Sequence, residues 1–473
     1  MPFSKPVGLT DVYVDDYIQA GQGGPNRMKA LRRHLWHQVD RVLAPPDVSE
    51  HKRNEAISLK KLRKGDGCWT TRKVILGWII DTLRQTLEIP GHRKVELTQL
   101  LSSLCKARRI SRKRYEKALG KLRFVAEAIP GAKGLFGTLQ MALQQATEGR
   151  IKMTPHLKDH LYSFARIAAD LRDRPTHLAE LIPQEPSFLG TTDAAKPGMG
   201  GVYFDSNETP YLWRFPMPEL VKERWIAADN PEGTITNSDL EHAAALAQVS
   251  LISHRHDTQC ATITTGMDNT PAISRVAKGA VADEGPASHL CIYACEHQRQ
   301  HRYYHSAQFL SGLRNRMADD ASRLQHLTDA SFLAHFEQHY PQAQPWVLLH
   351  LPHEIASKLT SALLALSPPR PTLPKRLAPR PMPLITGPPS ASSKGSPLPS
   401  VISKTQRAAL ASFSSTDSDT DAKAAPVTLS ALIRWQRHSR PWPRGSPTWV
   451  NPILGKQDQE TNFIPYSKLS LTP

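Results

Sequence analysis

The fold is decided by one stretch, Thr192-Asp193-Ala194-Ala195-Lys196-Pro197-Gly198-Met199-Gly200-Gly201. It places an acid at the end of a run of β-forming residues, and its glycine-rich turn leads into a second such run. Together with the residues further on, this pattern predicts strands over residues 188–193, 201–204 and 211–215. This part of the chain is therefore expected to begin with three strands.

The segments that follow predict a mixed α/β domain over residues 186–340. Apolar residues at helical spacing alternate there with short β-forming runs. The predicted order is three strands, helix, strand, helix, strand, helix. The later strands are expected over residues 261–265 and 305–310, and the helices over residues 238–254, 288–300 and 329–339.

Three further acidic positions stand at the ends of these elements. Glu241 lies in the first turns of the first helix, and Asp268 comes just after the fourth strand. Asp319, followed directly by Asp320, comes after the fifth strand. Any one of these acids alone is usually a solvated turn residue. Four carboxylates brought together would repel one another, however, and divalent cations relieve such repulsion.

This combination of acids and element order resembles the ribonuclease H domain of retroelements, especially gypsy-like and tyrosine-recombinase retrotransposons. The segment from Asn315 to Arg323 resembles the closing motif of that family, in which an Asn, an Ala-Asp and a Ser-Arg recur. Ala195 stands where the family frequently has a serine. The resemblance implies metal-dependent hydrolysis of the RNA strand of RNA–DNA hybrids with two Mg2+ (or Mn2+) ions. The catalytic and metal-binding carboxylates that it implies are Asp193, Glu241, Asp268 and Asp319, with Asp320 as the alternative to Asp319.

A second acidic motif, Tyr13-Val14-Asp15-Asp16, lies near the N-terminus between short β-forming runs. Adjacent carboxylates at a hairpin tip offer the oxygen ligands that magnesium prefers, although an acidic turn in water is the plain alternative. The motif resembles the active site of reverse transcriptases, and Val74-Ile75-Leu76-Gly77-Trp78 resembles their primer-grip hairpin. The resemblance implies a partial polymerase palm over residues 1–91, with Tyr13, Asp15 and Asp16 as a motif remnant and both acids as metal ligands.

The same resemblance implies a third metal-binding aspartate and nucleotide-binding fingers before this motif. Only ten residues precede Asp11, so we expect no polymerase activity from this sequence. A helix opened by Pro25 is predicted between the two palm hairpins, since its apolar residues recur at helical spacing. Strands are expected over residues 75–80 and 86–89.

Residues 92–185 are predicted to be helical and strongly basic, and the resemblance makes them a thumb or connection region. Ser111 is expected to cap one helix, and others are expected over residues 135–146 and 157–171. We expect the basic residues to bind the phosphate backbone of nucleic acid, with a merely solvated face as the alternative. The residues singled out are Arg108, Arg109, Arg112, Lys113, Arg114 and Lys117.

Composition agrees with a polyanionic partner, because 60 Lys and Arg against 43 Asp and Glu leave a formal charge of +17. Five cysteines without a paired framework indicate a reducing compartment, cytoplasmic or nuclear. No membrane partner is expected, since the longest apolar run, residues 74–80, is too short to span a bilayer. Residues 366–473 are rich in Pro and Ser and are expected to be mostly disordered, although Trp435, Trp442 and Trp449 are unusual there.

The expected architecture is thus a ribonuclease H-like mixed sheet with flanking helices, preceded by a partial α+β palm and a helical connection. Two alternatives remain open. One is a non-catalytic nucleic-acid-binding remnant of a decayed retroelement polyprotein. The other is an integrase or transposase nuclease, which shares the fold but places its essential glutamate on a late helix, whereas Glu241 opens the first one. The sequence makes no prediction of the oligomeric state.

Overall fold

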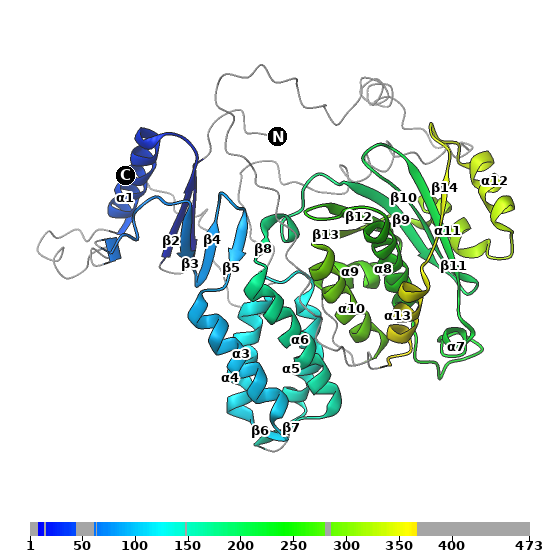
Figure 1. Ribbon diagram of the computed structural model, residues 1–473, viewed down its shortest axis with the longest axis horizontal. Helices are drawn as coiled ribbons and strands as arrows, with labels where there is room; N and C mark the ends of the chain where they lie inside the picture. The colour runs from blue at the N-terminus through cyan, green and yellow to red at the C-terminus, as the bar shows by residue number, and fades with distance from the viewer. Residues whose placement is uncertain are drawn as a thin grey trace, which may run out of the picture.

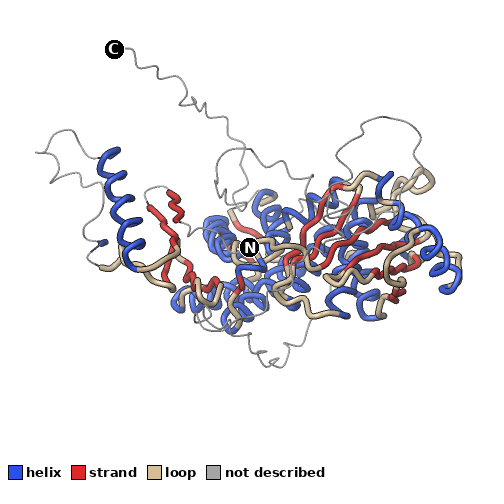
Figure 2. The backbone as a smooth tube through the Cα atoms, turned by 90° about the horizontal axis from the view of Figure 1, so that it is seen from above, coloured by secondary structure: helices blue, strands red, loops and turns tan. Residues whose placement is uncertain are grey.

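The computed structural model describes residues 8–13, 16–43, 61–62, 64–146, 149–279 and 285–366 (Figure 1). Asp15 and all of the predicted tail except Leu366 lie outside these ranges. Figures 1 and 2 show the N-terminal elements at one end of an elongated arrangement and the α/β part at the other, with the helical part between them. No helix in the described ranges is long and apolar enough to cross a membrane.

The N-terminal hairpin pairs β1 (Gly8–Tyr13) with β2 (Asp16–Gly21), and Tyr13 lies opposite Asp16. This confirms the predicted strand–turn–strand, but the backbone alone is described at these two residues. Helix α1 (Pro25–Leu43) begins at the predicted proline. A Cβ atom at Gly8 would stand only 2.6 Å from Cδ2 of Leu31 on this helix. The helix therefore packs closely on the hairpin because glycine occupies that strand position.

A second sheet corrects one prediction. Residues 75–80 were expected to form a single strand, but the chain reverses at Leu76 (φ 48°) and Gly77 (φ 83°). Two successive positive φ values are typical of the tight turn that joins antiparallel strands. Residues 72–81 therefore form a hairpin, as the resemblance of residues 74–78 to a hairpin implied, and not the single strand that the apolar pattern predicted. The sheet has the order β3-β4-β5-β8 and contains β3 (Arg72–Ile75), β4 (Trp78–Asp81), β5 (Thr86–Glu88) and β8 (Thr176–His177).

The helical part packs around the buried side chains of Tyr115, Leu122 and Phe164. Ser111 precedes its basic helix as predicted, but its side chain forms no capping hydrogen bond. Thr154 does cap a helix, because its side chain accepts a hydrogen bond from the Leu157 amide. The elements are α3 (Gly91–Lys106), β6 (Arg109–Ser111), α4 (Arg112–Ala126), η2 (Ala132–Leu135), α5 (Phe136–Gln144), β7 (Arg150–Lys152), α6 (Pro155–Asp173) and η3 (Leu178–Glu180).

The α/β part is built on a six-stranded mixed sheet, which confirms the prediction of a mixed sheet with flanking helices. Its first three strands are antiparallel neighbours, and β12 and β13 run parallel to β9. The order across the sheet is β13-β12-β9-β10-β11-β14. The strands are β9 (Phe188–Ala194), β10 (Gly198–Phe204), β11 (Pro210–Pro216), β12 (Thr262–Met267), β13 (Tyr304–Phe309) and β14 (Val347–His350).

Helices cover both faces of this sheet, as Figure 2 shows from above. One apolar cluster joins strand residues such as Trp213 to α8 (Asn237–Arg255), α10 (Pro286–His301) and α13 (His353–Leu363). Another joins residues such as Leu212, from the opposite face, to α11 (Arg316–Arg323) and α12 (Asp329–His339). The smaller elements are α7 (Glu219–Lys222), α9 (Thr270–Lys278) and η4 (Gly312–Arg314).

The α/β part shares its core with its neighbours. Strand β14 and helix α13 both lie beyond residue 340, the boundary predicted for this domain, and α13 contributes to the core beneath the sheet. On the other side, Cys295 of α10 is buried in the core of the helical part. Arg302 donates a hydrogen bond to the buried Glu180 at 2.9 Å. The helical and α/β parts therefore form a continuous body.

Candidate metal-binding site

Three carboxylates meet at one edge of the six-stranded sheet. Asp193 lies on β9, Asp268 follows the end of β12, and Glu241 lies near the start of α8. Because β9 and β12 are parallel neighbours, their carboxyl ends share this edge. Each residue offers one oxygen atom, and the three atoms lie within 4.8 Å of one another. Asp193 and Glu241 are buried, whereas Asp268 is exposed.

A glycine on β10 allows α11 to approach this edge. Gly200 lies opposite Asp193 in the β9–β10 pair. A Cβ at Gly200 would stand 2.4 Å from the carbonyl carbon of Ala321, a distance that real Cβ atoms do not show. Glycine at this position therefore lets α11 lie against the sheet, and it brings the Asp319 end of that helix to the carboxylates.

Two further side chains of this segment fix Asp193 and its strand. Asn315 donates a hydrogen bond from Nδ2 to the Thr192 carbonyl oxygen at 3.0 Å, inside the core. Ser322 donates from Oγ to Asp193 Oδ2 at 2.5 Å. Sequence reasoning identified both residues as part of the closing motif but assigned them no role. The recurrence of an Asn and a Ser in that motif was the signal that could have indicated a role for them.

A capping box positions Glu241. Thr236 Oγ1 accepts a hydrogen bond from the Asp239 amide, and Asp239 Oδ2 accepts one from the Thr236 amide at 2.8 Å. Asp239 also pairs with Arg275 at 2.7 Å. Asp239 is therefore occupied in starting α8 and is not available to the carboxylate group. Glu241 lies two residues further along, in the first turns of the helix.

The two adjacent acids of α11 have different surroundings. Asp320 accepts a hydrogen bond from Tyr340 Oη at 2.8 Å and lies 2.9 Å from His335 Nε2. Asp319 pairs with Arg323 at 2.6 Å, and its charge raises the pKa of Asp193. Successive helical residues point about 100° apart, so only one of the two faces the site. Asp319 is that residue, although its oxygens are not among the three that lie within 4.8 Å of one another.

The electrostatics of the site disfavour the charged forms of its carboxylates. Burial, together with the charges of the neighbouring Asp193 and Asp268, raises the pKa of Glu241 to about 9. Burial also raises the pKa of Asp193, against the opposing hydrogen bond from Ser322, and burial raises the pKa of Asp268. Glu241 Oε1 accepts a 3.4 Å hydrogen bond from the Ala194 amide, whereas buried Oε2 has no partner among the described residues.

This donor set fits a hard divalent cation. Carboxylate oxygens are the ligands that Mg2+ and Mn2+ prefer, and a cation would compensate the charge that raises these pKa values. An unpartnered, buried carboxylate oxygen is costly unless it coordinates something. The predicted residues Asp193, Glu241 and Asp268 are thus brought together, with Asp319 beside them.

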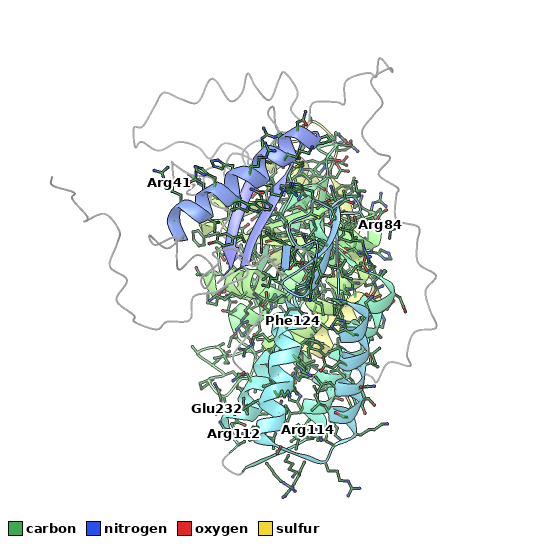
Figure 3. The ribbon with its side chains drawn as sticks, turned by 90° about the vertical axis from the view of Figure 1, so that its left-hand side faces the viewer. Arg41, Arg84, Arg112, Arg114, Phe124 and Glu232 are labelled. Atoms are coloured by element: carbon green, nitrogen blue, oxygen red, sulfur yellow. The ribbon has the colours of Figure 1, made fainter. Side chains whose placement is uncertain are left out.

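The predicted phosphate-binding residues lie elsewhere. All six are exposed, on β6, at the start of α4 and directly before them. Figure 1 places β6 and β7 at the end of the helical part that points away from both larger sheets, and Figure 3 shows Arg112 and Arg114 there. Arg112 pairs with Glu116 at 3.1 Å and donates to the Ala146 carbonyl oxygen at 3.0 Å. The basic end is therefore remote from the carboxylate group.

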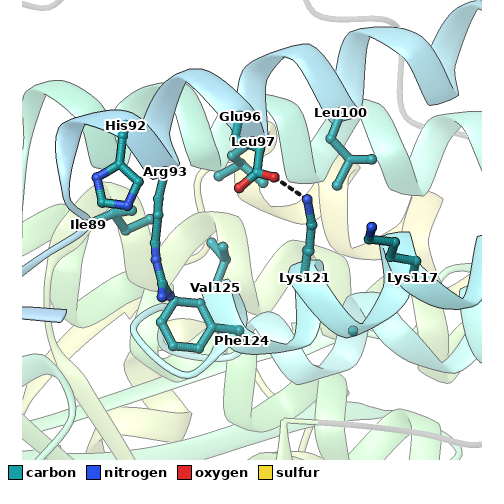
Figure 4. Close-up of a pocket in the computed structure, with 11 residues that line it drawn as sticks. Ile89, His92, Arg93, Glu96, Leu97, Leu100, Lys117, Lys121, Phe124 and Val125 are labelled. Atoms are coloured by element: carbon teal, nitrogen blue, oxygen red, sulfur yellow. Dashed lines mark hydrogen bonds and ion pairs between the residues drawn. The ribbon is translucent and has the colours of Figure 1, made fainter. Parts of the chain in front are cut away.

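Sequence reasoning missed a basic cavity of about 550 Å3 between α3 and α4 (Figure 4). Lys121 pairs there with Glu96, and the Arg93 guanidinium lies 4.7 Å from the ring centroid of Phe124. Of the six predicted residues only Lys117 lines it. The helix α3 carries fewer basic residues than α4, so charge density alone did not identify its contribution.

No family model matches this chain, and no curated protein matches it. Among solved structures, this chain is similar to three structures of a foamy viral protease–reverse transcriptase, and each match covers 64% of this chain. The complex of the dRH form with double-stranded DNA has 11% identity, a TM-score of 0.30 and 46% coverage of that chain. The complex with RNA/DNA hybrid has 10% identity, a TM-score of 0.24 and 41% coverage of that chain. A further complex with double-stranded DNA has 12% identity, a TM-score of 0.25 and 63% coverage of that chain. This chain thus spans less than two thirds of each, and TM-scores of this size do not establish a common fold.

Proposed function

We propose that the α/β part is a metal-dependent endonuclease of the ribonuclease H type, which hydrolyses the RNA strand of RNA–DNA hybrids. The observation that carries this proposal is the convergence of Asp193, Glu241 and Asp268 within 4.8 Å at one sheet edge. Asp319 completes the proposed set as the fourth carboxylate. Asp320 is excluded from it because its carboxylate is bonded to Tyr340 and His335.

The topology supports the proposal. Three antiparallel strands are followed by two strands parallel to the first, and a helix that carries a glutamate connects the two sets. This is the order that the resemblance to retroelement ribonuclease H implied. Cations held by these carboxylates supply Lewis-acid chemistry for phosphodiester hydrolysis.

The chain's own residues hold the site in place. Ser322 orients Asp193, Arg323 restrains Asp319, and the amide of Ala194 holds one oxygen of Glu241. Gly312 of η4 lies against Asp268, since a Cβ there would stand 3.2 Å from Asp268 Oδ2. Because η4 borders the site in this way, its exposed residues next to Gly312 are suitably placed to contact a substrate.

The remainder of the chain extends this assignment. We assign residues 1–91 to a partial reverse transcriptase palm, 92–185 to a thumb or connection and 366–473 to a tail. The nuclease comprises residues 186–340 together with β14 and α13, which complete its sheet and core. The cations are Mg2+ or Mn2+, two in the nuclease site. The exposed basic end of the helical part binds the phosphate backbone of the hybrid. Its distance from the nuclease site requires a duplex that extends from one part to the other.

The alternative is a nucleic-acid-binding protein without catalysis, favoured by the separation of the basic end from the carboxylates. A cleavage assay on the full chain distinguishes the two. The proposal predicts that the wild-type protein cuts the RNA of a labelled hybrid with Mg2+, that Asp319→Asn is inactive, and that Asp320→Asn retains activity. Hybrid binding without any cleavage would support the alternative and overturn the proposal.

A further inference from the structure

Three histidines gather where the helical part meets the α/β part. His156 and His160 are one turn apart near the start of α6, and His289 lies in the first turns of α10. The ring centroids of His156 and His160 are 4.7 Å apart, and those of His156 and His289 are 5.7 Å apart. None of the three belongs to the carboxylate site.

His160 is the most unusual of the three. Its side chain is fully buried, with 0% exposed, and neither ring nitrogen has a hydrogen-bond partner among the described residues. His156 Nε2 is also buried without a partner there. A neutral imidazole carries one N–H donor and one lone pair. Burying both of them unpartnered is unfavourable, so these nitrogens are available to a ligand that the described residues do not supply.

His289 has a neighbour that suits a metal ligand. Its Nδ1 lies 3.0 Å from the Gly285 carbonyl oxygen. A proton on Nδ1 would be donated to that oxygen, which leaves the lone pair on Nε2 free. Ligating histidines usually make such a bond from their other nitrogen.

We propose that His156, His160 and His289 bind one zinc-type divalent transition-metal ion, which links α6 to α10. Two histidines four residues apart on a helix form a familiar chelating pair, and three protein ligands leave a fourth position for water. Imidazole nitrogens favour Zn2+ or Co2+ over Mg2+, so the site differs in metal class from the carboxylate group.

The spacing of the rings suits this coordination. Metal–nitrogen bonds of about 2 Å in a tetrahedral site place imidazole centroids about 5 Å apart, and the two measured spacings lie on either side of that value. Among the described residues, only the carboxylate group already holds three donor atoms within 4.8 Å of one another. Metal binding here therefore includes rotation of the imidazole rings about their side-chain bonds.

The test uses the full chain without a polyhistidine tag, stripped of metal with a chelator that is then removed. Co2+ is titrated in excess Mg2+, which keeps the carboxylate group occupied, and visible absorption reports tetrahedral coordination. We expect one equivalent to bind in the wild-type protein and in the control His339→Gln, which alters an exposed histidine on α12. His160→Leu should lose this absorption.

His160→Leu replaces an unpartnered polar group by an apolar one of similar size, so the variant should fold without metal, and its thermal midpoint verifies this. If it does not fold, His289→Gln takes its place and should lose the same signal. Absence of a tetrahedral Co2+ spectrum in the wild-type protein would overturn the proposal. Undiminished Co2+ binding by folded His160→Leu would do the same.

Discussion

Glu241→Gln should stabilise the metal-free protein, although it replaces a deeply buried residue. The pKa of Glu241 is about 9 in the folded chain against 4.5 for an ordinary glutamate. Its folded-state pKa is raised, so its contribution to stability is present below pH 4.5 and is lost as the pH rises towards 9. At pH 7.5 that loss covers three pKa units, which corresponds to at most about 4 kcal/mol. A glutamine at position 241 remains neutral and therefore avoids this loss of stability.

A second buried glutamate provides the matched control. The side chain of Glu180 has 0% exposure and pairs with Arg302 at 2.6 Å and with Arg299 at 3.5 Å. Removing one partner of a buried ion pair costs about 3–5 kcal/mol, so Glu180→Gln should lower the thermal midpoint. The assay is thermal unfolding in chelator at pH 7.5 and again at pH 5, where the gain from Glu241→Gln should nearly vanish. A lower midpoint for Glu241→Gln at pH 7.5 would refute the electrostatic account of the site.

Three other predictions follow from the same structure. Asp268→Asn should abolish cleavage and leave hybrid binding nearly unchanged, as measured by a gel assay and by titration; an unchanged cleavage rate would remove Asp268 from the site. Burial lowers the pKa of His305 from 6.5 to about 4, so its contribution to stability falls by about 2 kcal/mol between pH 7.5 and 5. Denaturation at both pH values should show that the free energy of unfolding of His305→Gln falls by about 2 kcal/mol less than that of the wild type between pH 7.5 and 5. An equal fall in both proteins would contradict this. Replacing Arg112, Lys113 and Arg114 together by Gln should flatten the slope of log K against log salt by about two to three, whereas an unchanged slope would leave them as a solvated face.

The six-stranded sheet was largely predictable because its strands are β-forming runs bounded by turn residues. The same pattern places Asp193 at the end of β9 and Asp268 after β12, whereas it was the resemblance to retroelement ribonuclease H that singled these two acids out as candidate site residues. Strand β14 was not predicted, because four residues become a strand only by pairing with β11. The β-forming pattern did not indicate the turn at Leu76, because its side chain is apolar and continues the run around it, whereas the resemblance of residues 74–78 to a hairpin did.

Tertiary contacts decided what the sequence left ambiguous at the site. Asp319 and Asp320 are equivalent as a pair of letters, and only the positions of Tyr340 and His335 distinguish them. The histidine cluster was not predicted either. His289 is far from His160 in sequence, and it is the packing of α10 on α6 that makes them neighbours.

The most direct test of the nuclease assignment is a comparison of three labelled substrates with the full chain: RNA–DNA hybrid, single-stranded RNA and duplex DNA. The proposed function predicts cleavage of the RNA strand of the hybrid alone, with Mg2+ or Mn2+, and none after chelation. Equal cutting of all three substrates, or cleavage that survives chelation, would contradict the account.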